Sequence, residues 1–261
     1  MRITVLIENS TSRPELVAEH GLSLLVEARG LRLLFDMGAS AAFAENARRL
    51  GVDLSLVDAA VLSHGHYDHG GGIARFLELN SHAPVWVSRH AFERHYNAAG
   101  KDIGLPQVLA RDPRVRCTPS AVYELAPGVV LYAAAPGKFP IPDSGMTTLV
   151  DNQHVPDDFR HEQYLLVEEN GFRYLFSGCS HGGILNIVAR FQPDVLVGGF
   201  HLMKADPVAD APMLEQVARG LVEQKTQYYT GHCTGAGASG FLKQRLRERL
   251  VLLSTGMVMN A

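Results

Sequence analysis

Short hydrophobic runs separated by turn-forming residues fill the first third of the chain. Runs that alternate apolar and polar positions, or stay apolar throughout, predict strands, because successive side chains of a strand point to opposite faces. The strands predicted here are 3–8, 22–27, 32–36 and 57–62. Apolar positions at helical spacing predict helices over 39–50 and 73–79, the first with Ser40 as its N-cap and Gly51 just beyond its end.

The last third of the chain alternates between strands and helices. Its predicted strands are 163–168, 172–176, 195–198 and 227–230, and its predicted helices are 184–191, 213–224 and 241–249. Two halves that each combine strands with helices predict a four-layer α/β fold, with two mixed sheets face to face and helices on both outer faces. No low-complexity tract marks a boundary, so a single domain over 1–261 is expected.

The stretch between the two halves, about 101–158, has a different composition. It is richer in proline and glycine and mixes short strands with long loops. Long irregular stretches in a compact domain commonly carry binding loops. We therefore expect an irregular flap here that selects the substrate.

Composition and charge narrow the classes of function. The chain carries 24 basic and 27 acidic side chains, a formal charge of -3, which disfavours nucleic acid as a partner. No apolar run approaches the about 18 residues of a membrane span, and the N-terminal run is too short for a signal peptide. A cytoplasmic protein with a small-molecule substrate and no membrane contact is expected, and a homo-oligomer is left open. Cys117, Cys179 and Cys233 lie far apart and are odd in number, which argues against a disulfide framework.

One loop holds a concentration of metal-ligating side chains. His64, His66, Asp68 and His69 follow the strand predicted at 57–62, among glycines that let the backbone turn them toward one point. Imidazole and carboxylate ligands suit zinc, with manganese or iron as alternatives, and four such groups divided in pairs suit two ions. The spacing therefore predicts a metal centre at a strand end.

Further ligands are expected from the ends of other strands. The Asn-Gly pair at 170–171 predicts a two-residue hairpin turn, which places His161 opposite Ser180. The same hairpin therefore brings His161 close to the segment 178–181, which contains a cysteine and a histidine. His232 follows another predicted strand between glycine and cysteine, and it is the last candidate ligand.

The pattern as a whole resembles the metallo-β-lactamase superfamily, whose signature is His-x-His-x-Asp-His after an apolar strand. Several segments resemble a narrower subgroup, named after a synthase of methanopterin biosynthesis that joins a dihydropterin to a ribofuranosylaminobenzene phosphate. These segments are 8–9, 19–23, 161–163, 178–184 and 231–235. The resemblance covers nearly the whole chain and implies the four-layer αββα sandwich, but it is much less specific for substrate.

The resemblance also implies roles for individual residues. It implies that the first metal is bound by His64, His66 and His161, and the second by Asp68, His69 and His232. Cys179 occupies the position of a usual bridging aspartate, so a thiolate there would bind one ion without bridging both; a packing role for Cys179, with His181 as ligand, is the alternative. Asp36 matches an early structural aspartate that orients a ligand histidine.

Two adjacent ions favour hydrolysis, because a water bound to them ionises to hydroxide near neutral pH. We therefore expect a metal-dependent hydrolase that acts on an ester, lactone or phosphodiester-type small molecule. Asp68 would both ligate a metal and orient the hydroxide. His181 or His201 would stabilise the developing oxyanion or protonate the leaving group.

Three alternatives stay open at this point. The first is the pterin-condensing synthase, in which a pterin would stack on aromatic residues such as Tyr67, Phe139 or Phe200. The second is an iron-dependent dioxygenase, and the third is a metal-bound sensor without turnover. Metal content and a substrate panel would discriminate among them.

The other histidines are expected to lie outside the site. His90 and His95 are five apart in a predicted helix, a spacing that does not place two ligands on one face, so each is expected at the surface or in packing. His82 and His154 fall in predicted loops. His20 is a weak candidate for a substrate contact.

Overall fold

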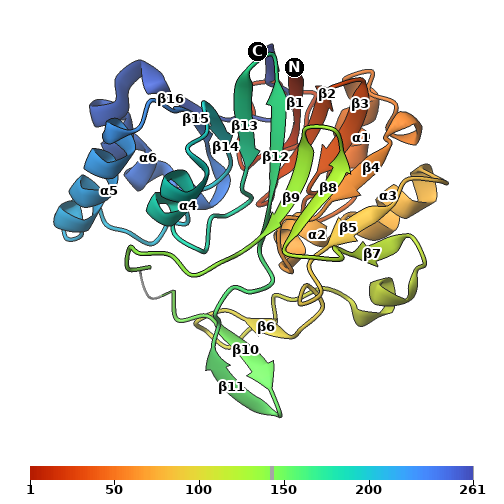
Figure 1. Ribbon diagram of the computed structural model, residues 1–261, viewed down its shortest axis with the longest axis horizontal. Helices are drawn as coiled ribbons and strands as arrows, with labels where there is room; N and C mark the ends of the chain where they lie inside the picture. Colours follow the sequence, from red (N-terminus) through yellow and green to blue (C-terminus); the bar gives the residue numbers. More distant parts are fainter. Residues whose placement is uncertain (142–143, 261) are drawn as a thin grey trace.

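Two seven-stranded sheets packed face to face form the body of the protein (Figure 1). The computed structural model describes residues 1–141 and 144–260. The first sheet has the order β17 (Val258–Asn260), β1 (Arg2–Ile7), β2 (Ser23–Ala28), β3 (Leu31–Phe35), β4 (Ala59–Val61), β5 (Val85–Val87) and β7 (Val115–Cys117). The second has the order β16 (Leu250–Leu252), β15 (Gln227–Thr230), β14 (Val195–Val197), β13 (Phe172–Phe176), β12 (Gln163–Glu169), β9 (Val129–Ala133) and β8 (Val122–Ala126).

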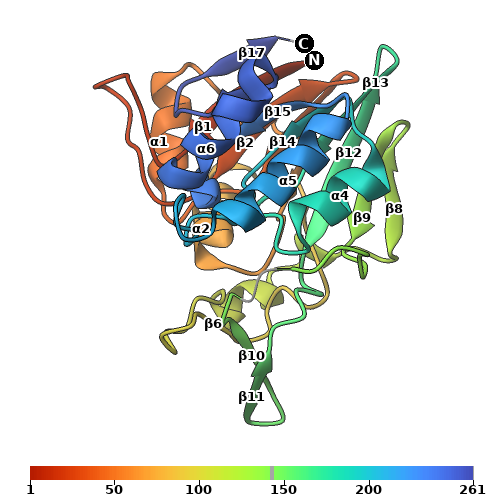
Figure 2. The ribbon, with the colours of Figure 1, turned by 90° about the vertical axis from the view of Figure 1, so that its left-hand side faces the viewer.

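Helices cover the outer face of each sheet, as Figures 1 and 2 show from two sides. Those on the first sheet are α1 (Ala42–Arg49) and α3 (Ile73–Leu79), and those on the second are α4 (Ile184–Phe191), α5 (Ala211–Glu223) and α6 (Ala236–Leu246). A single turn, α2 (Tyr67–Gly70), precedes α3. Short 3-10 turns lie at Leu54–Leu56, Gln107–Arg111, His232–Thr234 and Arg247–Arg249. The four-layer αββα prediction is confirmed.

The hydrophobic core consists of three layers of buried side chains, one between the two β-sheets and one under the helices on each outer face. Between the two β-sheets, the rings of Phe35 and Phe176 lie 5.7 Å apart, centroid to centroid. Phe43 and Phe76 fill the space under α1 and α3, and Leu214 is among the side chains that fill the space under α5. This burial on both faces explains why the strands are nearly continuous apolar runs, and it holds their ends rigidly in place.

The predicted hairpin is confirmed residue by residue. Glu169 pairs with Phe172 and Leu165 with Phe176, which is the register expected for a turn at 170–171. The helices predicted at 73–79 and 184–191 also have these bounds in the structure. Local sequence signals were therefore enough to predict an element's bounds where the element itself contained a turn or a strong apolar stripe.

Other boundaries differ from the prediction. The first helix has Ala41 rather than Ser40 as its N-cap, although the Ser40 hydroxyl accepts a hydrogen bond from the Ala42 N–H at 3.1 Å. The helix predicted at 241–249 begins at Ala236 and ends at Leu246, so the prediction was shifted by five and three residues at its ends. Glycine and other small residues in its first turns concealed its start, because they carry little apolar periodicity.

Two strands at the C-terminus were missed by the sequence analysis. They are β16 and β17, each three residues long, and they pair with β15 and β1. Three residues are too few to display alternation, so such strands exist because of their partners rather than their own pattern. As a result the C-terminal segment forms one edge strand of each large sheet.

The stretch 101–158 divides between the body and a projection from it. Strands β7 and β8 are edge strands of the two large sheets, and β9 lies next to β8. By contrast, β6 (His95–Tyr96), β10 (Thr147–Val150) and β11 (Gln153–Pro156) form a separate small sheet, which extends below the body in Figure 1. We name these three strands the flap sheet.

Within the part of the chain that the structure describes, no helix is long and apolar enough to cross a membrane.

Candidate metal centre

The loop after β4 carries the His-x-His-x-Asp-His motif across the end of the first sheet. His64, His66 and His69 are all buried there. Glycine is required at position 65, because a Cβ would lie 2.2 Å from the carbonyl oxygen of Ala91. The glycine thus allows the loop to pack tightly against its neighbour while the flanking histidines point inward.

One set of donor atoms lies where the two large sheets end side by side. We name it the body group: Asp68, His69, Cys179 and His232. The Nε2 atom of His69 lies 3.1 Å from His232 Nε2 and 3.2 Å from Cys179 Sγ, and Asp68 Oδ2 lies 3.2 Å from His232 Nε2. Nitrogen ligands around a tetrahedral ion are about 3.3 Å apart, given metal–nitrogen bonds of about 2.0–2.1 Å. These donors therefore stand at the spacing of a coordination shell.

Buried carboxylates anchor the body group from behind. Asp36 Oδ2 accepts a hydrogen bond from His69 Nδ1 at 2.7 Å, and the same carboxylate accepts from the N–H and hydroxyl of Ser63, both at 2.7 Å. Glu8 accepts from the backbone N–H of His232 at 2.7 Å. A carboxylate on the far nitrogen of a histidine leaves its Nε2 free to bind a metal and fixes the ring orientation.

A second set of donor atoms lies toward the flap sheet. We name it the flap group: His66, His95, Asp157 and His161, whose donor atoms all lie within 4.8 Å of one another. The helix predicted around His95 was wrong. His95 begins strand β6 instead of lying in a helix, and it is 1% exposed.

His64 lies between the two groups. Its ring centroid is 4.2 Å from that of His69 and 4.6 Å from that of His66, and its Nε2 lies 3.3 Å from His181 Nε2. The rings of His64 and His161 are 5.8 Å apart. The three histidines that the resemblance assigns to the first metal therefore lie close together, next to the body group.

Burial sets the protonation of these side chains. It lowers the pKa of His64, His66 and His181 well below the ordinary value, so each ring is neutral at pH 7 and keeps a lone pair. Burial alone would raise the pKa of Asp68, but neighbouring histidines, His69 foremost, hold it well below its usual range. Burial raises the pKa of the Cys179 thiol.

The donor set fits a divalent metal. Several buried ring nitrogens find no hydrogen-bond partner among the described residues: His66 Nε2, His95 Nε2, His161 Nε2, His181 Nδ1 and His201 Nδ1. A buried polar atom left unpaired costs about 1–3 kcal/mol, so five in one region favour a bound ligand there. Neutral imidazoles with carboxylates and a thiol are donors that suit zinc and similar ions.

His181 and His201 lie side by side next to this centre. Their ring centroids are 4.2 Å apart, and His181 stacks on Phe159 at 4.6 Å with the planes 9° from parallel. His201 has a left-handed backbone, with φ of 51°. Such a conformation is uncommon outside glycine and is found preferentially at functional sites.

A third buried anchoring carboxylate, Glu162, holds the segment that carries His181. It accepts hydrogen bonds from the backbone N–H groups of His181 at 2.7 Å and Gly182 at 2.9 Å, and from the Tyr164 hydroxyl at 2.6 Å. Burial raises the pKa of Glu162 to about 7. Glu8 and Glu162 thus play matching roles on two different loops.

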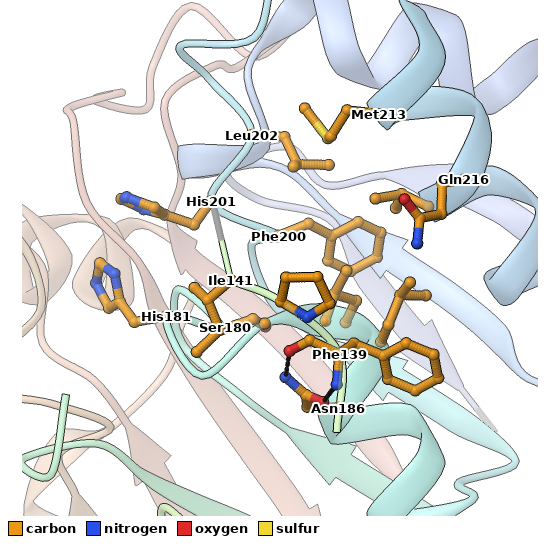
Figure 3. Close-up of a pocket in the computed structure, with 15 residues that line it drawn as sticks. Phe139, Ile141, Ser180, His181, Asn186, Phe200, His201, Leu202, Met213 and Gln216 are labelled. Atoms are coloured by element: carbon orange, nitrogen blue, oxygen red, sulfur yellow. Dashed lines mark hydrogen bonds between the residues drawn. The ribbon is translucent and has the colours of Figure 1, made fainter. Parts of the chain in front are cut away.

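Two cavities open beside the centre. One, of about 320 Å³, is the mouth over the metal site, and among the residues lining it are His20, Tyr67, Asp68, Lys204 and His201. The other, of about 200 Å³, is mostly apolar, with Phe139, Ile141, Phe200, Leu202 and Met213 among its walls. Figure 3 shows His181 and His201 together at one end of this apolar cavity. A ligand could therefore contact the histidines and the apolar walls at once.

The structure brings every residue predicted as ligand or catalytic group into this region. They are His64, His66, Asp68, His69, His161, Cys179, His181, His201 and His232. The sequence analysis missed four buried residues: Glu8, His95, Asp157 and Glu162. A signal was available for Glu8 and Glu162, which lie in the segments 8–9 and 161–163 that carry the family resemblance. His20 lies at the mouth, with its Nε2 3.3 Å from Asp68 Oδ2.

Comparison with known proteins identifies the family. The model of the metallo-beta-lactamase superfamily matches residues 17–197, which is more than half of the chain. The chain belongs to the metallo-β-lactamase superfamily. Among solved structures, this superfamily member is similar to Tm1679, described as a metal-dependent hydrolase of the beta-lactamase superfamily, with a TM-score of 0.85 and 29% identity over 100% of this chain and 99% of that one.

Two further relatives of this superfamily member extend the comparison. A curated protein of Methanocaldococcus jannaschii, 7,8-dihydropterin-6-methyl-4-(beta-D-ribofuranosyl)-aminobenzene-5'-phosphate synthase, is 28% identical over 92% of this chain and 90% of its own length. Zinc-bound PqqB from Methylobacterium extorquens has a TM-score of 0.59 at 14% identity, covers both chains fully, and shares the fold alone. The recognised family and fold are therefore confirmed, whereas the curated relative is a synthase.

Proposed function

We propose that this protein is a metal-dependent hydrolase that acts on an ester, lactone or phosphodiester of a small molecule. The observation that carries the proposal is the pair of adjacent donor groups, linked by His64 and lined by buried nitrogens that have no hydrogen-bond partner among the described residues. The similarity to Tm1679, which is described as a metal-dependent hydrolase, supports the same class. Two zinc ions per chain are part of the proposal.

The residues that would hold the ions follow from the donor groups. His66 and His161, with His64, would bind one ion, and the body group would bind the other. When bound, such ions lower the pKa of a coordinated water and polarise the oxygen of the bond to be cleaved. Asp68, which is held in its ionised form, would orient the attacking water from the mouth of the site.

His181 would stabilise the negative charge that develops on the substrate, and His201 would transfer a proton to the leaving group. Both rings reach the apolar cavity, and the Nδ1 atom of each lacks a partner among the residues described. His181 is held in place by stacking on Phe159 and by the hydrogen bond from its backbone N–H to Glu162. A ring fixed in this way suits a hydrogen-bond donor to an oxyanion. His201 is partly exposed and can pass a proton to the leaving group and exchange it with water.

The cavities indicate how the substrate would lie. The apolar cavity would take an apolar portion of the substrate, while the reacting bond would lie in the mouth above Asp68. Phe139 contributes a wall from the stretch 101–158, held there by paired hydrogen bonds with Asn186 of 2.7 and 2.9 Å (Figure 3). This stretch would therefore select among substrates, as a flap does.

A condensing synthase is the second candidate, because the curated synthase is similar over 92% of this chain. The aromatic residues considered for pterin stacking differ in the structure. Phe200 is 2% exposed and packs against Tyr228, whereas Tyr67 is 36% exposed at the mouth and Phe139 is 40% exposed. Lys101 lies 5.5 Å from the Tyr67 ring centroid and would place a positive charge near a phosphorylated substrate.

The test is a direct comparison of the two reactions with one metal-loaded preparation. Aryl esters, lactones and phosphodiesters are assayed for hydrolysis, and a dihydropterin bearing a phosphorylated leaving group is assayed for coupling to a ribofuranosylaminobenzene phosphate. Hydrolysis that disappears in His66→Ala supports the proposal, and coupling alone replaces it with the synthase. Bound iron together with oxygen consumption would indicate a dioxygenase. No activity in any assay, with both ions bound, would indicate a sensor.

A further inference from the structure

The loop between β1 and β2 brings two exposed side chains, Asn9 and His20, to the edge of the body group. The loop packs closely there, because a Cβ at Gly21 would lie 2.7 Å from the carbonyl oxygen of Asp68. The His20 ring lies beside the His232 ring, with centroids 4.6 Å apart. Close backbone packing therefore places both side chains next to metal ligands.

Two backbone groups fix the orientation of the Asn9 amide. The Gly21 N–H, which can only donate, lies 3.3 Å from Asn9 Oδ1, and the His232 carbonyl oxygen, which can only accept, lies 3.3 Å from Asn9 Nδ2. An amide side chain has an acceptor oxygen on one side and a donor nitrogen on the other. The backbone therefore decides which end of the amide faces each neighbouring ring.

The two ends of this amide select opposite tautomers in two histidines. Asn9 Oδ1 accepts a hydrogen bond from His232 Nδ1 at 3.0 Å, so a neutral His232 ring has its proton on Nδ1 and its lone pair on Nε2. Asn9 Nδ2 donates to His20 Nδ1 at 3.3 Å, so a neutral His20 ring has its proton on Nε2. One side chain thus sets the proton positions of a predicted ligand and of the ring beside it.

Each tautomer has a consequence for the body group. The free Nε2 of His232 lies 3.1 Å from His69 Nε2 and 3.2 Å from Asp68 Oδ2. Because His69 Nδ1 donates to Asp36, a neutral His69 ring also has its lone pair on Nε2. Two lone pairs and a carboxylate oxygen that face one another at these distances are satisfied together by a bound cation. The Nε2–H of His20 donates to Asp68 Oδ2 at 3.3 Å and holds that carboxylate in place.

We propose that Asn9 is a positioning residue of the metal centre. Its Oδ1 keeps His232 Nε2 free for the body-group ion, and its Nδ2 orients Asp68 through His20. This inference rests on the proposed function for the presence of that ion, and it adds two residues to which the proposed function gives no role. An amide suits the role, because a carboxylate can only accept and could not select different tautomers in the two rings. The alternative is that Asn9 only fastens its loop through the two backbone hydrogen bonds.

The zinc affinity of the full-length chain tests the support of His232. Metal-free wild type, Asn9→Ala and Asn9→Asp are titrated with zinc against a chromophoric chelator, and thermal unfolding confirms that each variant is folded. We expect Asn9→Ala to bind the body-group ion about 10–100-fold more weakly, as when the group behind a ligand histidine is removed. Asn9→Asp keeps an acceptor for His232 Nδ1 and should stay within about threefold of wild type. The control is Asn260→Ala, which removes an exposed amide on β17 and should bind as wild type.

The tautomer of His20 is a readout that a fastening role would not change. In the zinc-loaded protein with ¹⁵N-labelled histidine, the shifts of the two ring nitrogens distinguish a proton on Nδ1 from one on Nε2. We expect His20 to carry its proton on Nε2 in wild type. The carboxylate in Asn9→Asp can only accept, so this variant should place a proton on His20 Nδ1. Loss of the signal in His20→Gln assigns it.

The outcomes separate this inference from the proposed function. Unchanged zinc affinity in Asn9→Ala, equal losses of affinity in Asn9→Ala and Asn9→Asp, or a His20 Nδ1 without a proton in Asn9→Asp would each overturn the positioning role and leave the hydrolase standing. Wild type that binds no zinc would overturn both. Wild type that binds two ions and hydrolyses nothing, with the Asn9 variants as expected, would overturn the hydrolase alone. Weaker zinc binding in Asn9→Ala together with the moved proton in Asn9→Asp supports the positioning role.

Discussion

The body group and the flap group use similar side chains but are held by different means. Body-group ligands come from the loops after β4, β13 and β15 in the two large sheets, and the buried carboxylates of Asp36 and Glu8 fix two of them. The flap group takes half of its members from a three-stranded sheet that projects from the molecule. The comparison teaches that the first group is preformed by the fold, whereas the second depends on how the flap sheet is docked.

The largest expected effect is the loss of the anchor behind the body group. Asp36→Ala leaves two buried donors, the Ser63 N–H and the His69 Nδ1–H, without the acceptor that they have in the wild type. We expect the free energy of unfolding of the metal-free protein to fall by about 3–5 kcal/mol, as when one partner of a buried pair is removed. Urea unfolding measures this free energy. Asp58→Ala, which removes an exposed acceptor for the Arg32 N–H, should change stability by less than about 1 kcal/mol, and equal losses in both variants would contradict the anchoring role.

Loss of a ligand should impair metal binding and activity without unfolding the protein. His66→Ala removes a buried nitrogen with no partner in the described structure, so the three apolar layers stay intact. We expect hydrolysis to fall more than about 100-fold, with the thermal midpoint of the metal-free protein unchanged within a few degrees. Turnover and differential scanning fluorimetry check the two parts. His82→Ala serves as the control, and wild-type turnover in His66→Ala would remove the site assignment.

The two buried glutamates should separate metal binding from turnover. Glu8→Gln weakens the support of His232, and we expect the affinity for the body-group ion to fall about 10–100-fold. Glu162→Gln disturbs the segment that carries His181, and we expect turnover to fall while metal affinity stays within about threefold. Chelator competition and steady-state kinetics on both variants measure this. Equal changes of metal affinity and turnover in both variants would show that Glu8 and Glu162 do not support separate functions.

The smallest effect concerns the pH dependence of metal binding. Burial raises the pKa of the Cys179 thiol, so at neutral pH the metal-free site holds a neutral thiol that must release a proton to coordinate an ion. Affinity at the body group should therefore rise with pH in wild type, and in Cys179→Ala the slope should fall by one proton per ion. Isothermal titrations at pH 6 to 8 check this. Cys233→Ala is the matched control, and an unchanged slope in Cys179→Ala would mean that Cys179 serves only in packing.

Much of the fold could be predicted because its signals are local. Buried strands and the turn at 170–171 show in short windows, so the layers and the hairpin register followed directly. The short strands β16 and β17 could not be predicted, because only pairing with β15 and β1 defines them. His95 was misplaced for the same reason: two residues of strand have no periodicity.

For the candidate site, the sequence by itself determined the donor chemistry. The motif from His64 to His69 places imidazoles and a carboxylate within one loop, and no packing argument accounts for them. Only the tertiary structure decided which distant residues join that loop. Glu8 and His232 lie 224 positions apart, and His95 and Asp157 lie 62 apart, yet each pair is hydrogen bonded. The physical reason is that coordination and burial depend on distance in space, which the meeting of sheet ends and the docking of the flap sheet fix.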